Sequence, residues 1–178
     1  MYSAPSSPVA ADATSVAVLS IHTMAEGDRA AFDPLYLPSA VDRENRLQPP
    51  SSRVPGPASF YSTALWLRAA FADLHYDIHH VVADGDLVVV NSTMIGRHDA
   101  AWAVYADDGG VDAVFPPTHK TFAMTQSHWF RMQDGKIAEH WANRDDLGMA
   151  RQVGWIPPTP AFLFRMARAK RRVTRAGA

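Results

Sequence analysis

The sequence predicts an α+β domain, in which a cone-shaped, curved antiparallel sheet carries N-terminal helices over its concave face. Up to about residue 73 the apolar residues follow helical spacing, and from there to residue 145 they mostly alternate with a period of two. Two Asp-Gly pairs, at residues 84–85 and 134–135, mark tight turns between long strands. Helices followed by a meander of strands pack as layers, and the curl of the sheet makes room for a small-molecule pocket.

Length and composition fit one globular domain. The chain has 178 residues, of which 47% are hydrophobic and 20% charged. We expect a flexible leader at residues 1–12, the α+β cone at 13–154, and a Pro-rich break with a basic helix or tail at 155–178. Because the chain has no cysteine, a disulfide scaffold, a cysteine nucleophile and a thiolate metal site are excluded.

Charge and hydropathy limit the partners. The six bases of residues 165–178 leave eleven bases against eighteen acids in residues 1–164, which therefore carry a formal charge of −7. Because residues 1–164 are this acidic, we expect them not to bind nucleic acid. No apolar run approaches the roughly 20 residues of a membrane span, and the N-terminus has no export signal, so we expect a cytoplasmic protein.

The N-terminal half reads as three helices. Apolar spacing from Val16 to Met24 predicts a first helix capped by Thr14 or Ser15, and Gly27 separates it from a short second one that ends before Pro38. The prolines of residues 46–57 predict an extended loop. A third helix begins near Pro57 or Ser59 and carries an apolar stripe to residue 71.

The second half reads as two hairpins and two further helices. Residues 75–82 pair with 87–96, and residues 121–132 pair with 136–145. Between the hairpins, residues 99–119 predict an irregular insertion with apolar anchors, which we expect to act as a lid over the cone mouth. Helical spacing returns at 145–153 and 161–173. The outer strand faces, with Val89, Ile95 and Trp129, predict a homodimer.

The alternation of each strand divides its side chains between two faces. On the first strand of the later hairpin the apolar face points inward, and it carries Met124, Gln126, His128, Phe130 and Met132. On the second strand Glu139, Trp141, Asn143 and Asp145 share one face, and His140, Ala142 and Arg144 share the other. We assign substrate binding to Trp141, Asn143, Gln126, Met124, Phe130, His98, Trp66 and Phe60.

Histidines suggest two kinds of site. An inward His128 among apolar neighbours suits proton relay near neutral pH, or it is a buried histidine bonded to a neighbouring strand. His75, Asp77 and His79 share a strand face, but they spread over about 13 Å and cannot converge on one ion. We therefore expect no metal site. Because no phosphate-binding loop or dinucleotide fingerprint is present, we expect no cofactor.

Three segments together resemble the SnoaL-like polyketide cyclases of the nuclear-transport-factor-2-like superfamily, which has a cystatin-like cone. The segments are FADLHYDIHHVVADGDLVVVNSTMIGRHDA, FPPTHKTFAM and WFRMQDGKIAEHWANRDDLGMARQVG, in the family's order. The resemblance implies an α+β cone, commonly dimeric, and assigns acid/base chemistry to Asp145, at the end of the last strand. Asp145 is also a good N-cap for the helix that follows. The chain departs from the pattern at Arg43, His119 and Ala142.

The leading hypothesis is therefore a cofactor-free enzyme that cyclises or isomerises a small hydrophobic carbonyl compound such as a polyketide, with catalysis by Asp145 and His128. The alternative is a non-catalytic module that binds a small ligand or a protein, favoured if the chain's own tryptophans fill the pocket. The basic tail is expected to dock through Phe162 to Met166 on the protein itself or on its dimer mate, with its arginines on acidic surface. Attachment to a membrane surface is the competing hypothesis.

Overall fold

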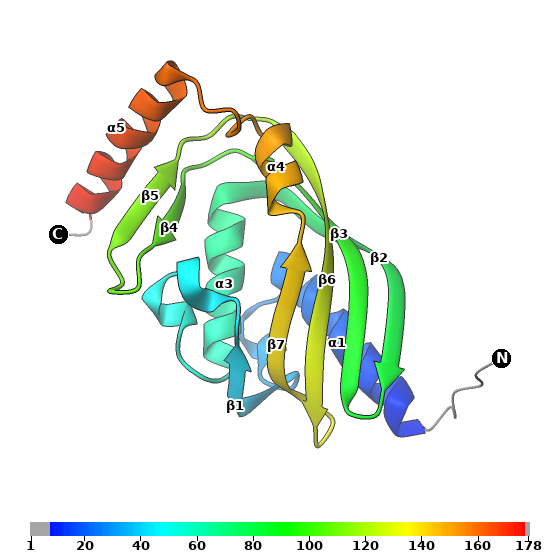
Figure 1. Cartoon of the computed structure of the whole chain (residues 1–178). Helices are drawn as coiled ribbons and strands as arrows, with labels where there is room; N and C mark the ends of the chain where they lie inside the picture. The colour runs from blue at the N-terminus through cyan, green and yellow to red at the C-terminus, as the bar shows by residue number, and fades with distance from the viewer. Residues whose placement is uncertain (1–7, 177–178) are drawn as a thin grey trace.

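A computed structural model describes residues 8–176 of the chain, and Figure 1 shows the order of its elements. The helices are α1 (Pro8–Glu26), α2 (Arg29–Phe32), α3 (Pro57–Ala70), α4 (Asp146–Gln152) and α5 (Pro160–Ala176), with 3-10 turns at Asn45–Leu47 and Pro50–Ser52. The strands are β1 (Tyr36–Asp42), β2 (Phe71–Asp84), β3 (Leu87–His98), β4 (Trp102–Tyr105), β5 (Val111–Phe115), β6 (Thr121–Gln133) and β7 (Lys136–Arg144).

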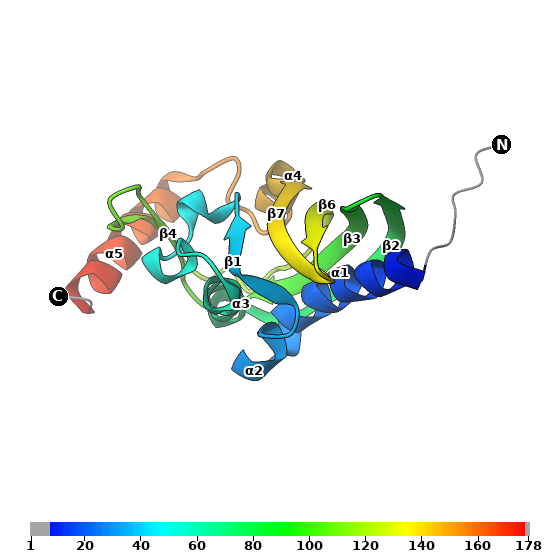
Figure 2. The ribbon, with the colours of Figure 1, turned by 90° about the horizontal axis from the view of Figure 1, so that it is seen from below.

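The main sheet has five strands in the order β1-β7-β6-β3-β2. Every pair in it is antiparallel except β1 with β7, which is parallel. Figure 2 shows the sheet curving over α1 and α3. The predicted class, a curved antiparallel-dominated sheet with helices on its concave side, is confirmed.

Turns and a bulge set the strand register. Asp134 and Gly135 both have positive φ, at 51° and 73°, as a two-residue hairpin turn requires, and Gly85 has φ 59° in the other hairpin. The register of β6 with β7 shifts between Arg131 and Met132. One residue of β7, Ala138, has no partner at this bulge.

The core fills the space between the helices and the concave face of the sheet. Its fully buried members include Ala17 and Ile21 of α1, Phe60 and Ala64 of α3, and Val88, Val90, Phe130 and Ile137 of the sheet. This packing fixes which strand face points inward, because a one-residue slip would expose the whole apolar set.

Several element predictions need correction. The first helix begins at Pro8 rather than at Thr14, because proline and alanine suit a first helical turn. Residues 36–42 form an edge strand, where Pro38 is tolerated. The insertion is a regular hairpin, β4 with β5. Residues 1–7 of the expected leader lie outside the described residues.

The C-terminal helix docks on the protein, as expected. Helix α5 packs against β5, and Phe162 is buried there. The expected acidic contacts are wrong, because Arg165 and Lys170 donate to the backbone carbonyls of Pro117 and Asp112. Within residues 8–176, no helix has the length and apolar character to cross a membrane.

Candidate active site

A cavity of about 690 Å³ opens between α3, the concave face of the sheet and the β4–β5 hairpin. Its wide end is aromatic and apolar, lined by Trp66, Phe71, Trp102, Phe115 and Trp155. Trp102 and Trp155 stack with ring centroids 5.2 Å apart, and the indole Nε1 of Trp66 donates to the Ala103 carbonyl at 2.7 Å. These flat walls suit a ring-containing ligand.

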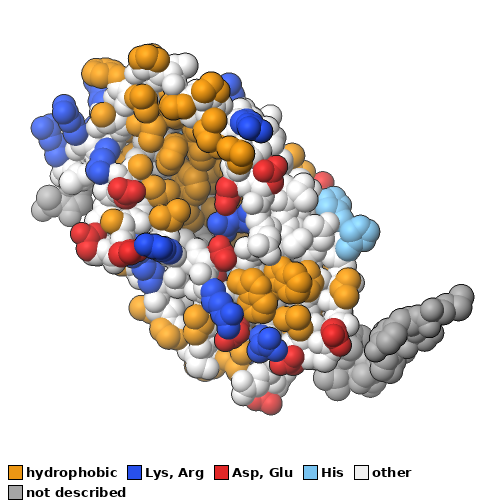
Figure 3. All heavy atoms as spheres, viewed as in Figure 1, with side chains coloured by type: hydrophobic (Ala, Val, Ile, Leu, Met, Phe, Trp, Pro, Cys, Tyr) orange, Lys and Arg blue, Asp and Glu red, His pale blue; other side chains and the backbone are white. Residues whose placement is uncertain are grey.

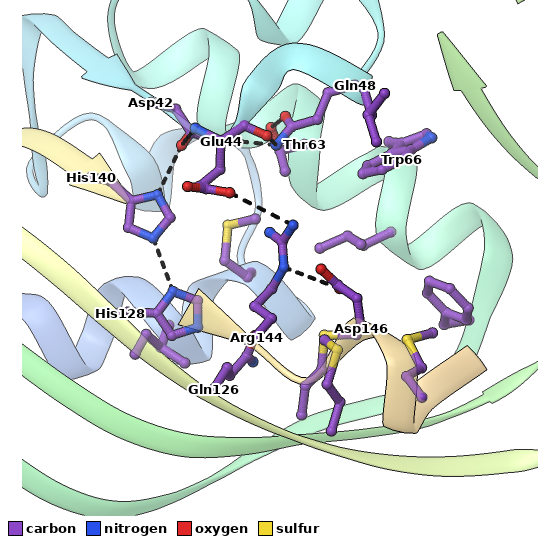
Figure 4. A pocket seen from close by; sticks show the side chains of 18 of the residues that line it. Asp42, Glu44, Gln48, Thr63, Trp66, Gln126, His128, His140, Arg144 and Asp146 are labelled. Carbon is purple, nitrogen blue, oxygen red and sulfur yellow. Dashed lines mark hydrogen bonds and ion pairs between the residues drawn. The ribbon is translucent and has the colours of Figure 1, made fainter. Parts of the chain in front are cut away.

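The narrow end of the cavity holds a chain of three side chains from three adjacent strands (Figure 4). Asp42 ends β1, His140 lies on β7 and His128 lies on β6. The His140 Nδ1 lies 3.0 Å from the Asp42 Oδ1, and the His128 Nδ1 lies 2.9 Å from the His140 Nε2. All three side chains line the cavity.

The hydrogen bonds of Asp42 keep its carboxylate ionised. Asp42 also accepts from the Glu44 backbone N–H and from the Gln48 side chain, which in turn accepts from Thr63. Burial by itself would raise the pKa of Asp42, but its interactions with His140 and these hydrogen bonds outweigh burial and hold the pKa below its usual range. An ionised Asp42 accepts only, so His140 must donate from Nδ1.

That constraint passes along the chain to His128. If the His140 ring carries a single proton, that proton is on Nδ1, so its Nε2 accepts and His128 donates from its own Nδ1. The Nε2 of a neutral His128 then carries the lone pair, and this atom has no hydrogen-bond partner within residues 8–176. Burial, followed by the nearby His140, lowers the pKa of His128 well below its ordinary value, so the ring is neutral at pH 7.

Two further side chains, Gln126 and Arg144, line the cavity together with Asp42, His140 and His128. The Gln126 side chain is 3% exposed, lines the cavity two residues before His128, and its Nε2 has no partner within the described part of the chain. Nearer the mouth, the Arg144 guanidinium lies between two carboxylates, 3.7 Å from Glu44 and 3.3 Å from Asp146. Because two carboxylates flank it, the single positive charge of Arg144 is already compensated.

The structure brings together six of the ten residues expected at the site. All six line the cavity: Phe60, Trp66, Met124, Gln126, His128 and Phe130. Trp141, Asn143, Asp145 and His98 do not line it, so their expected placement is wrong.

The bulge in β7 explains three of these corrections. It pairs His128 with Ala142 and Trp129 with Trp141, which puts Trp141 and Asn143 on the convex face. If Ala138 were paired with Arg131 instead of forming the bulge, the register of the Asp134-Gly135 turn would place Trp141 opposite His128. Asp145 is exposed, and its Oδ1 accepts from the Gly148 backbone N–H at 2.8 Å, which confirms the capping role.

His98 lies behind the cavity wall. Its side chain is fully buried, with its ring 5.6 Å from that of Phe71 and 5.2 Å from that of Trp155. Burial lowers the pKa of His98 to about 4. This histidine therefore supports the aromatic wall and does not face a ligand.

The residues that the sequence reasoning missed come mainly from the opposite face of β7 and from residues 42–63. They are Asp42, Glu44, Gln48, Thr63, His140, Arg144 and Asp146. His140 and Arg144 were on the face not chosen, and only a signal for the bulge would have selected it. No residue pattern around Asp42 marks it as a partner of a strand nearly a hundred residues later.

The suggested histidine and carboxylate set on β2 does not form a cluster. His79 donates to or accepts from the Thr93 hydroxyl, and His75 contacts the Asp73 carbonyl. In the described part of the chain, no three His, Cys, Asp or Glu side chains are grouped so as to hold a metal ion.

Comparison with known proteins agrees with this architecture. The sequence profile of the SnoaL-like polyketide cyclases matches residues 22–153. Aklanonic acid methyl ester cyclase DnrD of Streptomyces peucetius is 32% identical over 106 residues, which span 59% of this chain and 66% of that relative.

Solved structures give the same fold. A SnoaL-like polyketide cyclase structure from Jannaschia sp. CCS1 superposes with a TM-score of 0.68 at 18% identity, over 88% of this chain and all of that one. A protein of ketosteroid isomerase-like fold from Catenulispora acidiphila gives 0.57 at 13% identity, over 78% and 92% of the two chains. The fold is thus that of the nuclear-transport-factor-2-like proteins, and on the profile match the chain belongs to the SnoaL-like polyketide cyclase family.

Proposed function

We propose that the chain catalyses a cofactor-free, acid/base ring closure of a hydrophobic carbonyl compound, with His128 as the base. The observation that carries this proposal is the buried Asp42–His140–His128 series, which ends at a histidine that lines a large aromatic cavity and whose Nε2 has no hydrogen-bond partner within residues 8–176. The base is thereby moved from Asp145 to His128, because the carboxylate of Asp145 does not line the cavity.

The chemistry is an intramolecular aldol closure. The His128 Nε2 removes a proton from the carbon next to a carbonyl, and the enolate carbon then attacks a second carbonyl carbon of the same molecule to form a C–C bond. The imidazolium returns its proton to the new alkoxide, so the base is regenerated. Asp42, acting through His140, stabilises the transient charge on His128, and the Gln126 amide donates to the enolate oxygen.

The size and lining of the cavity support a ring-containing, uncharged substrate. A volume of about 690 Å³ fits a drug-sized molecule, and the tryptophans line this space without filling it. This favours an enzyme over the non-catalytic alternative. Each arginine that lines the cavity within residues 8–176 has an acidic partner, because Arg144 lies between Glu44 and Asp146, Arg43 pairs with Glu139 and Arg46 pairs with Asp107, so none of them is a spare cation for a free carboxylate. An ester such as aklanonic acid methyl ester, named for the relative DnrD, is the class we propose.

The outer face of the sheet supports the proposed homodimer. Cross-strand pairs join Val82, Val89, Trp129 and Trp141 in one row across β2, β3, β6 and β7. Figure 3 shows a hydrophobic patch on this side of the molecule. The Arg43 guanidinium lies 5.1 Å from the centre of the Trp141 ring. Contact with a second copy would remove this apolar row from water.

The test compares two variants on aklanonic acid methyl ester. Turnover should fall by about 10² to 10⁴ in His128→Gln, the usual contribution of a general base. Asp145→Asn should keep its turnover. Ligand affinity, followed by tryptophan fluorescence, should persist in both. An equal loss in both variants would return the role of base to Asp145, whereas binding without turnover in the intact protein would favour the ligand-binding module.

A further inference from the structure

Helix α5 has one face that docks on the protein. Phe162, Met166, Ala169 and Val173 are buried or half-buried, and their spacing of four, three and four residues makes one stripe. This stripe packs against β5, and hydrogen bonds from Arg165 and Lys170 flank it. Docking therefore fixes which face of α5 points outward.

The outward face carries a second stripe with the same spacing. Phe164, Arg168, Arg171 and Arg175 follow the docked stripe two residues later, which is about half a turn around the helix. The Phe164 side chain is 69% exposed, and the neighbouring Leu163 is 51% exposed. Within residues 8–176 the three arginines have no ion pair or hydrogen bond, and the helix contains no acidic residue.

We propose that this outward stripe attaches the protein to an anionic lipid surface. Arginines in line give charge complementarity to anionic headgroups, and an exposed phenylalanine and leucine at one end of the line suit insertion below the headgroups. A nucleic acid would use the arginines but would leave the two exposed apolar side chains in water, whereas a lipid surface would use both. The outward surface is one convex helix, without the pocket that a protein partner's anchor would need.

Attachment would also orient the cavity. Ile156 is 40% exposed, lines the cavity and lies shortly before α5 in the chain. In Figure 3, hydrophobic side chains continue from the hollow toward the end of the molecule where α5 begins. An opening of the cavity held next to the lipid surface would be close to hydrophobic ligands, which concentrate in membranes. The attachment itself does not depend on whether the cavity is catalytic.

Co-sedimentation of the full chain with vesicles tests the proposal. The full chain should bind vesicles of phosphatidylcholine and phosphatidylglycerol in equal parts at physiological ionic strength, and should not bind phosphatidylcholine alone. Replacing the three outward arginines together, Arg168→Gln with Arg171→Gln and Arg175→Gln, should weaken binding on the order of a hundredfold, given about 1 kcal/mol for each arginine. Phe164→Ser should weaken it several-fold.

A matched control separates the stripe from net charge. The triple variant Arg29→Gln, Arg131→Gln and Lys136→Gln removes the same charge from positions outside α5, and it should keep its binding. Thermal melts by circular dichroism should show both triple variants folded, because five of the six residues are exposed and Lys136 is only half-buried.

Three results would overturn the proposal. The first is an intact protein that does not sediment with the anionic vesicles. The second is an equal loss of binding in the two triple variants, which would reduce the effect to overall charge. The third is displacement from the vesicles by mixed-sequence duplex DNA together with full binding by Phe164→Ser, which would identify a polyphosphate site.

Discussion

The two faces of the main sheet differ by a single residue along each strand, yet they carry different chemistry. The inward row of Val90, His128 and Ala142 crosses β3, β6 and β7 beside the cavity. The outward row of Val89, Trp129 and Trp141 crosses the same strands on the convex side. Which residue of β7 belongs to which row depends on the bulge at Ala138, so one unpaired residue decides the composition of the candidate site.

A change in the length of β7 should produce the largest effect. Insertion of one glycine after Ala138, with a single bulge kept, would turn Trp141 and Asn143 into the cavity, and would turn His140 and Arg144 out to solvent. Because the Asp42 carboxylate would then be buried without His140, we expect a loss on the order of 5 kcal/mol in the free energy of unfolding. Urea denaturation measures it. Deletion of Ala138 removes only the unpaired residue and should keep the same faces, so it is the matched control, and a stable insertion variant would contradict this account of the register.

The same bulge marks how far the sequence could predict this molecule. The hairpins, their Asp-Gly turns, the helix over residues 57–70 and the docked basic helix follow from local patterns, and the structure agrees. The inward face of β6 also followed, because its alternation is strongly apolar. The face of β7 did not, since Trp141 and His140 are both plausible inward residues and a bulge has no local signal here. Asp42 was missed because its contacts lie far away in sequence.

Two aspartates can be compared directly, because Asp42 lines the cavity and Asp145 lies outside it. Asp42→Asn should lower kcat by about 10² to 10⁴, because an amide in place of the carboxylate no longer fixes the proton positions of His140 and His128. Asp145→Asn should leave kcat unchanged and cost well under 1 kcal/mol of stability, because asparagine is also a good N-cap. Steady-state kinetics and thermal melts distinguish the two. An equal loss of kcat in the two variants would show that catalysis does not depend on the Asp42–His140–His128 proton relay.

The two buried histidines, His128 and His98, should make the free energy of unfolding depend on pH in the acid range. The pKa values of His128 and His98 lie below their ordinary value, so in the folded state they bind protons at lower pH than in the unfolded chain. Below about pH 6.5 the unfolded chain therefore binds more protons, and stability, which is full above this pH, falls toward pH 4. Each histidine contributes a slope of about 1.4 kcal/mol per pH unit at most.

Urea unfolding measured from pH 7.5 to pH 4.5, a range chosen to bracket about 6.5, tests this slope. His98→Phe keeps a ring between Phe71 and Trp155 but cannot be protonated, so it should remove about half of the slope. His75→Phe, at an exposed position on β2, should leave the slope unchanged. If His98→Phe has the slope of the unmodified chain, the histidine is not held neutral by burial.

The outer row should show the smallest effect on the cavity, and this makes it a test of the division between faces. Trp141→Ser removes one member of the Trp129–Trp141 stack, whose ring centroids are 6.0 Å apart, and it removes the aromatic partner of Arg43. Turnover should change less than about twofold, because Trp141 points away from His128, and the stack itself is worth on the order of 1 kcal/mol.

If the row is a dimer contact, however, light scattering at micromolar concentration should show a dimer for the unmodified chain and a monomer for the variant. The control His75→Phe should stay dimeric. A variant that loses turnover while remaining dimeric would mean that Trp141 reaches the cavity after all, and the separation of the two rows would fail.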